Sequence, residues 1–286
     1  MNTELTVTDN SGRSIAEMMG VSVQIDSNKR SSLARLTQIH KALMGDIEVA
    51  GKVIKTEVVP SGAYKLDLRV EGQVAYCLDP VIRIFALRQQ WTHWDAENNQ
   101  MDRSMMATDL KGDLKDSRGT FNIGRPSGYV EDWESLPQAT KDIMRSVKRT
   151  KVLFGTINLG TGAVDEAGNA VAGFDGDIPF IMDIKNKDSI KALDKALKLL
   201  ARKNVLPIQY TVELGAEEHT MPTGNTFASM VFSLKEPIAI SEEDNAVLKS
   251  FFDWMEWTNS YVKEQWESNN TDSIAGDFVD IEGAAV

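Results

Sequence analysis

The sequence has one cysteine and no long apolar run. Because Cys77 is the only cysteine among the 286 residues, an intramolecular disulfide and a zinc site built from cysteines are both excluded. No stretch approaches the roughly 18 consecutive apolar residues of a membrane span, and residues 1–20 lack the apolar core of a signal peptide. The sequence therefore predicts a reduced, cytoplasmic protein that does not enter the membrane.

The sequence also lacks the common catalytic and metal-binding motifs. Its three histidines lie far apart, and no pair has the HxxxH or HxH spacing of metal ligands. No P-loop and no GxSxG elbow occurs, and the later glycine after Gly160-Thr161-Gly162 is displaced from the dinucleotide-binding spacing. We therefore expect no metal, no cofactor and no enzymatic activity.

One pattern keeps an enzymatic alternative open. Asp175 and Asp177 precede Asp183-Ile184-Lys185, which resembles the D…(D/E)xK arrangement in which two carboxylates of a metal-dependent nuclease hold Mg²⁺. However, we expect Asp177 and Asp183 on or beside a single strand, where they point away from a shared metal. The nuclease is therefore the less favoured interpretation.

The charge of the chain is unevenly distributed. The chain has 42 Asp and Glu against 31 Lys and Arg, a formal net charge of -11. Residues 236–286 hold 12 of the acids and only two cations, Lys249 and Lys263, so the remainder is nearly neutral. Because the acidity belongs to the C-terminal segment, the net charge does not argue against a nucleic-acid ligand.

Short runs rich in β-branched and aromatic residues predict a β-rich chain. We expect a partly ordered arm over 1–31, one domain over 32–267 and a disordered acidic tail over 268–286. The expected strands are 47–59, 63–70, 73–78, 81–95, 151–159, 178–185, 207–214 and 227–234, and the expected helices are 31–44, 136–147, 188–203 and 242–266.

The order of these elements suggests a fold. From residue 81 onward, five strands occur with one helix between the third and the fourth, which is the layout of an OB-fold. The predicted class is therefore α+β and β-rich, with an OB-fold-like barrel over about 81–234 and extra strands before it.

Cations and aromatic residues alternate through the middle of the chain. Single-stranded nucleic acid is bound by such a mixture, because cations contact phosphates and flat rings stack on bases. The spacing of Arg145, Lys148 and Arg149 also places them on one face of a helix. The predicted nucleic-acid-binding residues are Arg83, Arg88, Trp91, Trp94, Arg125, Tyr129, Arg145, Lys148 and Arg149. Since any single aromatic is more often a core residue, the prediction depends on the whole set.

Two predicted helices have distinctive surfaces. The basic helix at 188–203 carries the cations Lys191, Lys195, Lys198, Arg202 and Lys203. We favour the interpretation that its leucines pack and its cations are solvated, over the alternative that it borders a groove. The aromatic helix at 242–266 has an apolar band too broad for a solvated surface, so it either seals the barrel or forms a subunit or partner interface.

The tail sequence Asp277-Phe278-Val279-Asp280-Ile281-Glu282 alternates acidic and apolar residues. Such a peptide suits docking into a basic, apolar-lined pocket of a partner, or competition with nucleic acid for the protein's own groove. A disordered terminus without a role is equally open. The predicted partner-binding residues are Asp277, Phe278, Asp280, Ile281 and Glu282.

Together these features resemble the phage and bacterial single-stranded DNA-binding proteins, over about residues 81–286. The resemblance lies in an OB-type core, a basic and aromatic groove and an acidic tail with an apolar tip, although such tails usually finish with Phe or with acids. It implies single-stranded DNA as ligand and replication or recombination proteins as partners of the tail, in the host cytoplasm if the chain is phage-encoded. A homo-oligomer, and a structural or assembly protein that uses the aromatic helix as its interface, remain alternatives.

Overall fold

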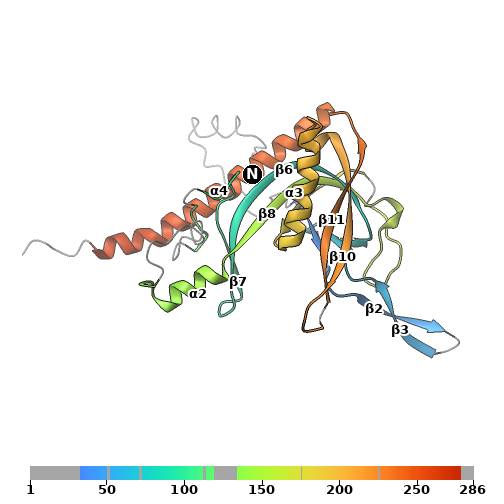
Figure 1. Cartoon of the computed structure of the whole chain (residues 1–286), viewed down its shortest axis with the longest axis horizontal. Coiled ribbons are helices and arrows are strands. Elements are labelled where there is room, and N and C mark those ends of the chain that lie inside the picture. Colours follow the sequence, from blue (N-terminus) through green and yellow to red (C-terminus); the bar gives the residue numbers. More distant parts are fainter. Residues whose placement is uncertain are drawn as a thin grey trace, which may run out of the picture. The chain divides into compact units, whose positions relative to one another are not determined.

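The computed structural model describes residues 33–277 except 50–51, 71–72, 112–113, 119–133, 175 and 225 (Figure 1). The arm expected over 1–31 and residues 278–286 of the expected tail lie outside the described residues. The described part of the chain has a large sheet, a separate two-stranded hairpin and three α-helices.

One open, mixed, nine-stranded sheet forms the centre of the fold. Its strands follow the order β11-β10-β6-β8-β9-β1-β4-β5, and β7 pairs with β6 beside this path. The bounds are β1 (Ala34–Gln38), β4 (Tyr64–Asp67), β5 (Val74–Cys77), β6 (Val81–Asp95), β7 (Gln100–Arg103), β8 (Lys148–Asn158), β9 (Ile178–Ile184), β10 (Tyr210–Thr220) and β11 (Thr226–Pro237). The α+β, β-rich class is confirmed. The expected barrel is not found, because the described strands form an open sheet in which β11 and β5 are the two ends.

The long strand β6 organises this sheet. It pairs with β8 along one side, while its other side is shared between β10 at Val81–Arg83 and β7 at Thr92–Asp95. All strand pairs in the sheet are antiparallel except β1 with β9. A separate hairpin, β2 (Leu43–Val49) with β3 (Lys52–Val59), follows β1 (Figure 1).

Two helices cover opposite faces of the sheet. Side chains alternate along a strand, so Leu153 of β8 packs in one cluster and Val152 in the other. The Leu153 cluster includes Leu193 of α3 (Lys187–Arg202), which connects β9 to β10 as predicted. The Val152 cluster includes Phe251 of α4 (Glu242–Asp277). Within the described residues, no helix has the length and apolarity needed to cross a membrane.

The helix predicted over 31–44 is wrong. Leucines at helical spacing suggested it, but β1 instead follows a two-residue period in which Leu36 and Gln38 are buried and Thr37 is exposed. This segment pairs with β4 on one side and with β9 on the other. Long-range strand pairing has therefore overridden the local pattern.

Two helix ends also differ from the expected positions. The short helix α2 (Gln138–Ser146) forms as predicted, but β8 begins at Lys148, so Lys148 and Arg149 do not share a helical face with Arg145. The aromatic helix α4 continues to Asp277, so residues 268–277, expected in the disordered tail, belong to it.

Candidate nucleic-acid interface

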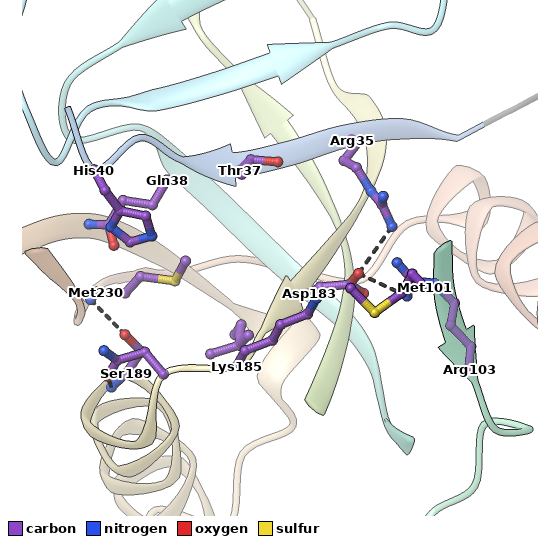
Figure 2. A pocket seen from close by; sticks show the side chains of 12 residues that line it. Arg35, Thr37, Gln38, His40, Met101, Arg103, Asp183, Lys185, Ser189 and Met230 are labelled. Atoms are coloured by element: carbon purple, nitrogen blue, oxygen red, sulfur yellow. Dashed lines mark hydrogen bonds and ion pairs between the residues drawn. The ribbon is translucent and has the colours of Figure 1, made fainter. Parts of the chain in front are cut away.

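A cleft of about 440 Å³ opens where β1 and β9 diverge (Figure 2). The two strands pair in parallel only at Ala34–Phe180 and Arg35–Ile181. Beyond these pairs, the chain from Thr37 to His40 and the chain from Asp183 to Asn186 line opposite sides of the cleft. Met101 and Arg103 of β7, Ser189 of α3 and Met230 of β11 complete its walls.

Two arginines from different strands meet on one carboxylate in this cleft. Arg35 of β1 donates to Asp183 Oδ2 at 3.1 Å, and Arg103 of β7 donates to the same oxygen at 3.0 Å (Figure 2). The other carboxylate oxygen, Oδ1, is buried and has no hydrogen-bond partner. Lys185 follows two residues later and lines the same cleft. Among the described residues that line the cleft, three cations therefore face a single acid.

The cations of the cleft lie close enough to repel one another. Burial lowers the pKa of Lys185, and Arg103, Arg35 and Lys148 lower it further, against the opposing effect of Asp183. Burial also lowers the pKa of Arg35, and Arg103 adds to this effect. Since an anion placed among these cations would relieve the repulsion, the site is suited to a negatively charged group such as a phosphate.

The start of α3 is fixed beside the cleft. Asn186 caps the helix, since its Oδ1 accepts from the backbone N–H groups of Asp188 at 2.8 Å and Ser189 at 3.1 Å. The Ser189 hydroxyl accepts from the Met230 N–H at 2.9 Å, which ties α3 to β11. These polar groups are hydrogen-bonded within the protein, whereas Arg35 and Arg103 each donate to Asp183 through one guanidinium nitrogen and carry further N–H donors that a ligand could use.

Two of the predicted binding residues are buried, and a third contacts α4. Arg83 is 8% exposed and forms an ion pair with Asp244 of α4, so it is removed from the candidate interface. Trp91 is also only 8% exposed, which makes it a core residue. The Arg88 guanidinium lies 5.3 Å from the ring centre of Phe252 on α4 and donates to the Leu87 carbonyl, so it is held against the helix.

Other predicted residues lie at the surface. Trp94 is 50% exposed, and Lys148 and Arg149 are exposed at the start of β8. Arg145 is exposed on α2, where it pairs with Asp142. Arg125 and Tyr129 lie outside the described residues, as do Phe278, Asp280, Ile281 and Glu282, whereas Asp277 is the last residue of α4.

The strand register places Trp94 on the same sheet face as the cleft cations. Thr92 pairs with both Arg103 and Lys148, and Trp94 is two residues further along β6. Because paired residues and residues two apart share a face, Trp94, Arg103 and Lys148 point to the same side of the sheet. Asp183 also belongs to this face, since it pairs with Val152, four residues from Lys148 on β8. Arg149, next to Lys148, points to the opposite face.

No sequence pattern connects Arg35, Arg103 and Lys185. Arg35 falls in a segment whose leucine spacing predicts a helix that does not form, and Lys185 belongs to the nuclease pattern. The feature that indicates a strand at Arg35 is the two-residue alternation of Ala34, Leu36 and Gln38 with more exposed neighbours.

Among the described residues of the nuclease pattern, Asp183 is the only carboxylate that lines the cleft. Asp177 is exposed just before β9, whereas Asp183 lies six residues later and is held by two arginines. Asp175 is outside the described residues. No cluster of three or more His, Cys, Asp or Glu suited to a metal occurs among the residues that the structure describes.

Comparisons of the chain with protein-family models, with curated proteins and with solved structures find no match of any of these three kinds.

Proposed function

We propose that this protein binds single-stranded DNA and that the cleft between β1 and β9 holds its phosphates. The observation that carries the proposal is the convergence of Arg35, Arg103 and Lys185 on a cleft that contains one carboxylate. A cation excess in a concave site attracts a polyanion, and the phosphate backbone is the main source of affinity in nucleic-acid binding.

The nearby tryptophan favours single-stranded over double-stranded DNA. Trp94 is half exposed, next to Met101 in the strand register and on the face that carries Arg103. An exposed indole ring can stack on an unpaired base, whereas the bases of a duplex are stacked on one another. The proposal needs only this open sheet surface and does not depend on an OB-fold barrel. A role in replication or recombination, with partners recruited by residues 277–282, remains part of the proposal.

Titration of a fluorescent oligothymidine with the full chain at several salt concentrations tests this proposal. The double variant Arg103→Gln/Lys185→Gln should bind at least about 10-fold more weakly and reduce the slope of log affinity against log salt by about 1.4, which is about 0.7 for each phosphate contact. The matched control, Lys249→Gln/Lys263→Gln on α4, removes the same charge and should leave both quantities unchanged.

Equal affinity of the cleft variant and the wild type would contradict the proposed site, and no binding of wild type at low salt would contradict the function. Duplex DNA and RNA of the same sequence serve as competitors. If the duplex competes as well as the single strand, then the assignment to single-stranded DNA is wrong.

An assembly role is a second candidate, and exposed rings on α4 favour it. Trp257 and Tyr261 are 37% and 45% exposed, and their rings stack with their centres 5.8 Å apart. Large exposed apolar groups of this kind mark interaction surfaces. A Tyr261→Glu variant would lower the mass of the protein in solution if this surface joins subunits, and would leave DNA affinity at the cleft unchanged.

A further inference from the structure

A second groove runs between α3 and the edge strand β11. It has a volume of about 700 Å³, and its apolar lining includes Ala192 and Leu199 of α3 and Val231, Phe232 and Leu234 of β11. Leu199 is 42% exposed, which is unusual for a leucine on a helix that packs against a sheet. The groove therefore offers apolar surface that nothing in the described part of the chain covers.

The groove lies along an open sheet edge. β11 pairs with β10 on one side and is the last strand of the described sheet. The Met230 N–H points away from β10, because it donates to Ser189 of α3. Since the direction of backbone groups alternates along an antiparallel strand, residues 232 and 234 also present their N–H and C=O groups at this edge. An extended peptide could add to the sheet here as a further strand.

The charge along the groove is polarised. Its two acids are at the Ser189 end, where Asp188 pairs with Lys191 and Glu217 lies opposite Ser229. Lys195 lies further along α3, and Lys203 lies at the far end, above the ring of Tyr210. Lys198 and Arg202 continue the exposed basic surface of α3 beside it. The half of the groove nearest Lys203 therefore suits an extended peptide that is both acidic and apolar.

We propose that this half of the groove binds residues 278–282 of a second copy of the chain. The sequence Phe278-Val279-Asp280-Ile281-Glu282 has the required chemistry. In an extended conformation, Val279 and Ile281 share one side and Asp280 and Glu282 share the other. Lys195, Leu199 and Lys203 are four residues apart on one stripe of α3, so the side of the peptide that faces α3 meets both the apolar surface and the lysines. Phe278 shares the side of Asp280 and Glu282, so it would contact Leu199 while the two carboxylates reach the lysines.

The peptide cannot reach the groove of the chain to which it belongs, so it binds the groove of another copy. α4 begins five residues after β11 ends, and its 36 residues span about 50 Å at 1.5 Å per residue. Asn259 accepts a hydrogen bond from the Met106 N–H, and Asn269 donates one to the Arg118 carbonyl. The second half of α4 therefore lies near the end of β6 that pairs with β7, whereas β10 pairs with the opposite end of β6. Glu282 is only five residues beyond Asp277, at most about 17 Å away.

The predicted contact joins copies head to tail. The donor peptide and the acceptor groove are different surfaces, so an open chain of copies keeps one free groove at one end and one free peptide at the other, and it can add copies at either end. This inference does not depend on DNA binding, and its tests are carried out without DNA.

Sedimentation velocity of the full chain at increasing protein concentration measures the assembly. Wild type should self-associate, and a variant that ends at Asp277 should not. The exposed double variant Lys195→Glu/Lys203→Glu should also lose self-association, whereas Lys249→Glu/Lys263→Glu on α4 is the matched control and should keep it. Unchanged association in the truncated variant or in the groove variant would overturn the proposal.

A charge exchange separates docking from misfolding. Asp280→Lys/Glu282→Lys should fail to associate alone, as should Lys195→Glu/Lys203→Glu, but an equimolar mixture of the two should recover association because the reversed peptide fits the reversed groove. A mixture that stays monomeric would contradict the pairing.

A labelled peptide of residues 277–286 tests the strand-addition geometry. It should bind the variant that ends at Asp277, and binding should fall at least about 10-fold when Lys195 and Lys203 are replaced by Glu. Of two peptides N-methylated either at Val279 and Ile281 or at Phe278 and Asp280, one should lose binding and the other should retain it, because only alternate N–H groups face the neighbouring strand. Equal binding of both would exclude strand addition.

Discussion

Arg83 of β6 and Asp244 in the first turn of α4 form a buried, two-fold hydrogen-bonded ion pair, with Nη1–Oδ1 at 2.7 Å and Nη2–Oδ2 at 2.8 Å. Asp244 also accepts from the Ser241 N–H at 2.8 Å, and the Ser241 hydroxyl accepts from the Asp244 N–H. The Asp244 carboxylate therefore has two roles: it caps the first turn of α4 together with Ser241, and it attaches the helix to β6 through Arg83. A cation that the sequence assigned to DNA therefore fixes the aromatic helix.

Replacing Asp244 with Ala should lower the free energy of unfolding by about 3–5 kcal/mol, because Arg83 would remain buried without its partner. Urea denaturation followed by circular dichroism measures this. Replacement of both residues, Arg83→Met/Asp244→Leu, should recover much of the loss. A single variant within about 0.5 kcal/mol of wild type would show that the pair does not anchor α4.

Replacing Trp94 with Ala should weaken binding of an oligothymidine about 5- to 150-fold, the loss of about 1–3 kcal/mol from one stacked base. The slope of affinity against salt should stay the same, because no cation is removed. Trp257→Ala on α4 is the control and should bind as wild type does. If Trp94→Ala retains full affinity, then this ring does not contact DNA.

The lowered pKa of Lys185 predicts a pH dependence. Burial and the neighbouring cations lower this pKa, so Lys185 loses its proton at a lower pH than an ordinary lysine. A bound phosphate favours the charged form, so the affinity for DNA should fall as the pH rises from about 7 to about 10. Lys185→Arg keeps its charge over this range and should show a smaller fall. Parallel pH profiles of the two proteins would contradict a contact between Lys185 and the phosphate.

Replacing Asp183 with Asn should tighten DNA binding several-fold, because Arg35 and Arg103 would no longer be neutralised by their shared carboxylate. The same variant distinguishes the nuclease alternative, in which Asp183→Asn abolishes Mg²⁺-dependent cleavage. Fluorescence anisotropy and a cleavage assay on one preparation give both results, with near-ultraviolet circular dichroism as a check of folding. Weaker binding, or loss of a cleavage activity present in wild type, would contradict the proposed role.

The sequence predicts a helix or strand correctly where apolar residues recur with one clear period. It predicts the wrong element where pairing between distant segments determines the structure. Local periodicity correctly predicts the strand at Val81–Asp95 and the helix that carries Leu193 and Leu200 on one stripe. In each pattern one side is clearly apolar. The segment around Arg35 satisfied a helical pattern as well as an alternating one. Its pairing with β4 and with β9, whose Asp183 lies 148 positions away from Arg35, selects the strand.

The candidate site was harder to predict than the elements. On β6, both faces of the sheet are covered by helices, so alternation does not distinguish a surface cation from a buried one. Arg83 therefore looked equivalent to Arg88, although only the fold shows that both contact α4. The cations of the cleft come from three separate strands or strand ends, and no local spacing connects Arg35, Arg103 and Lys185.

The parallel pairing of β1 with β9 also has a consequence during synthesis of the chain. β4 can pair with β1 soon after both have left the ribosome, but Asp183 and Lys185 are made much later. A nascent chain that lacks β9 carries Arg35 and Arg103 without their shared acid, and it cannot form the cleft. Any ligand of this cleft would therefore select full-length, folded molecules and discriminate against incomplete ones.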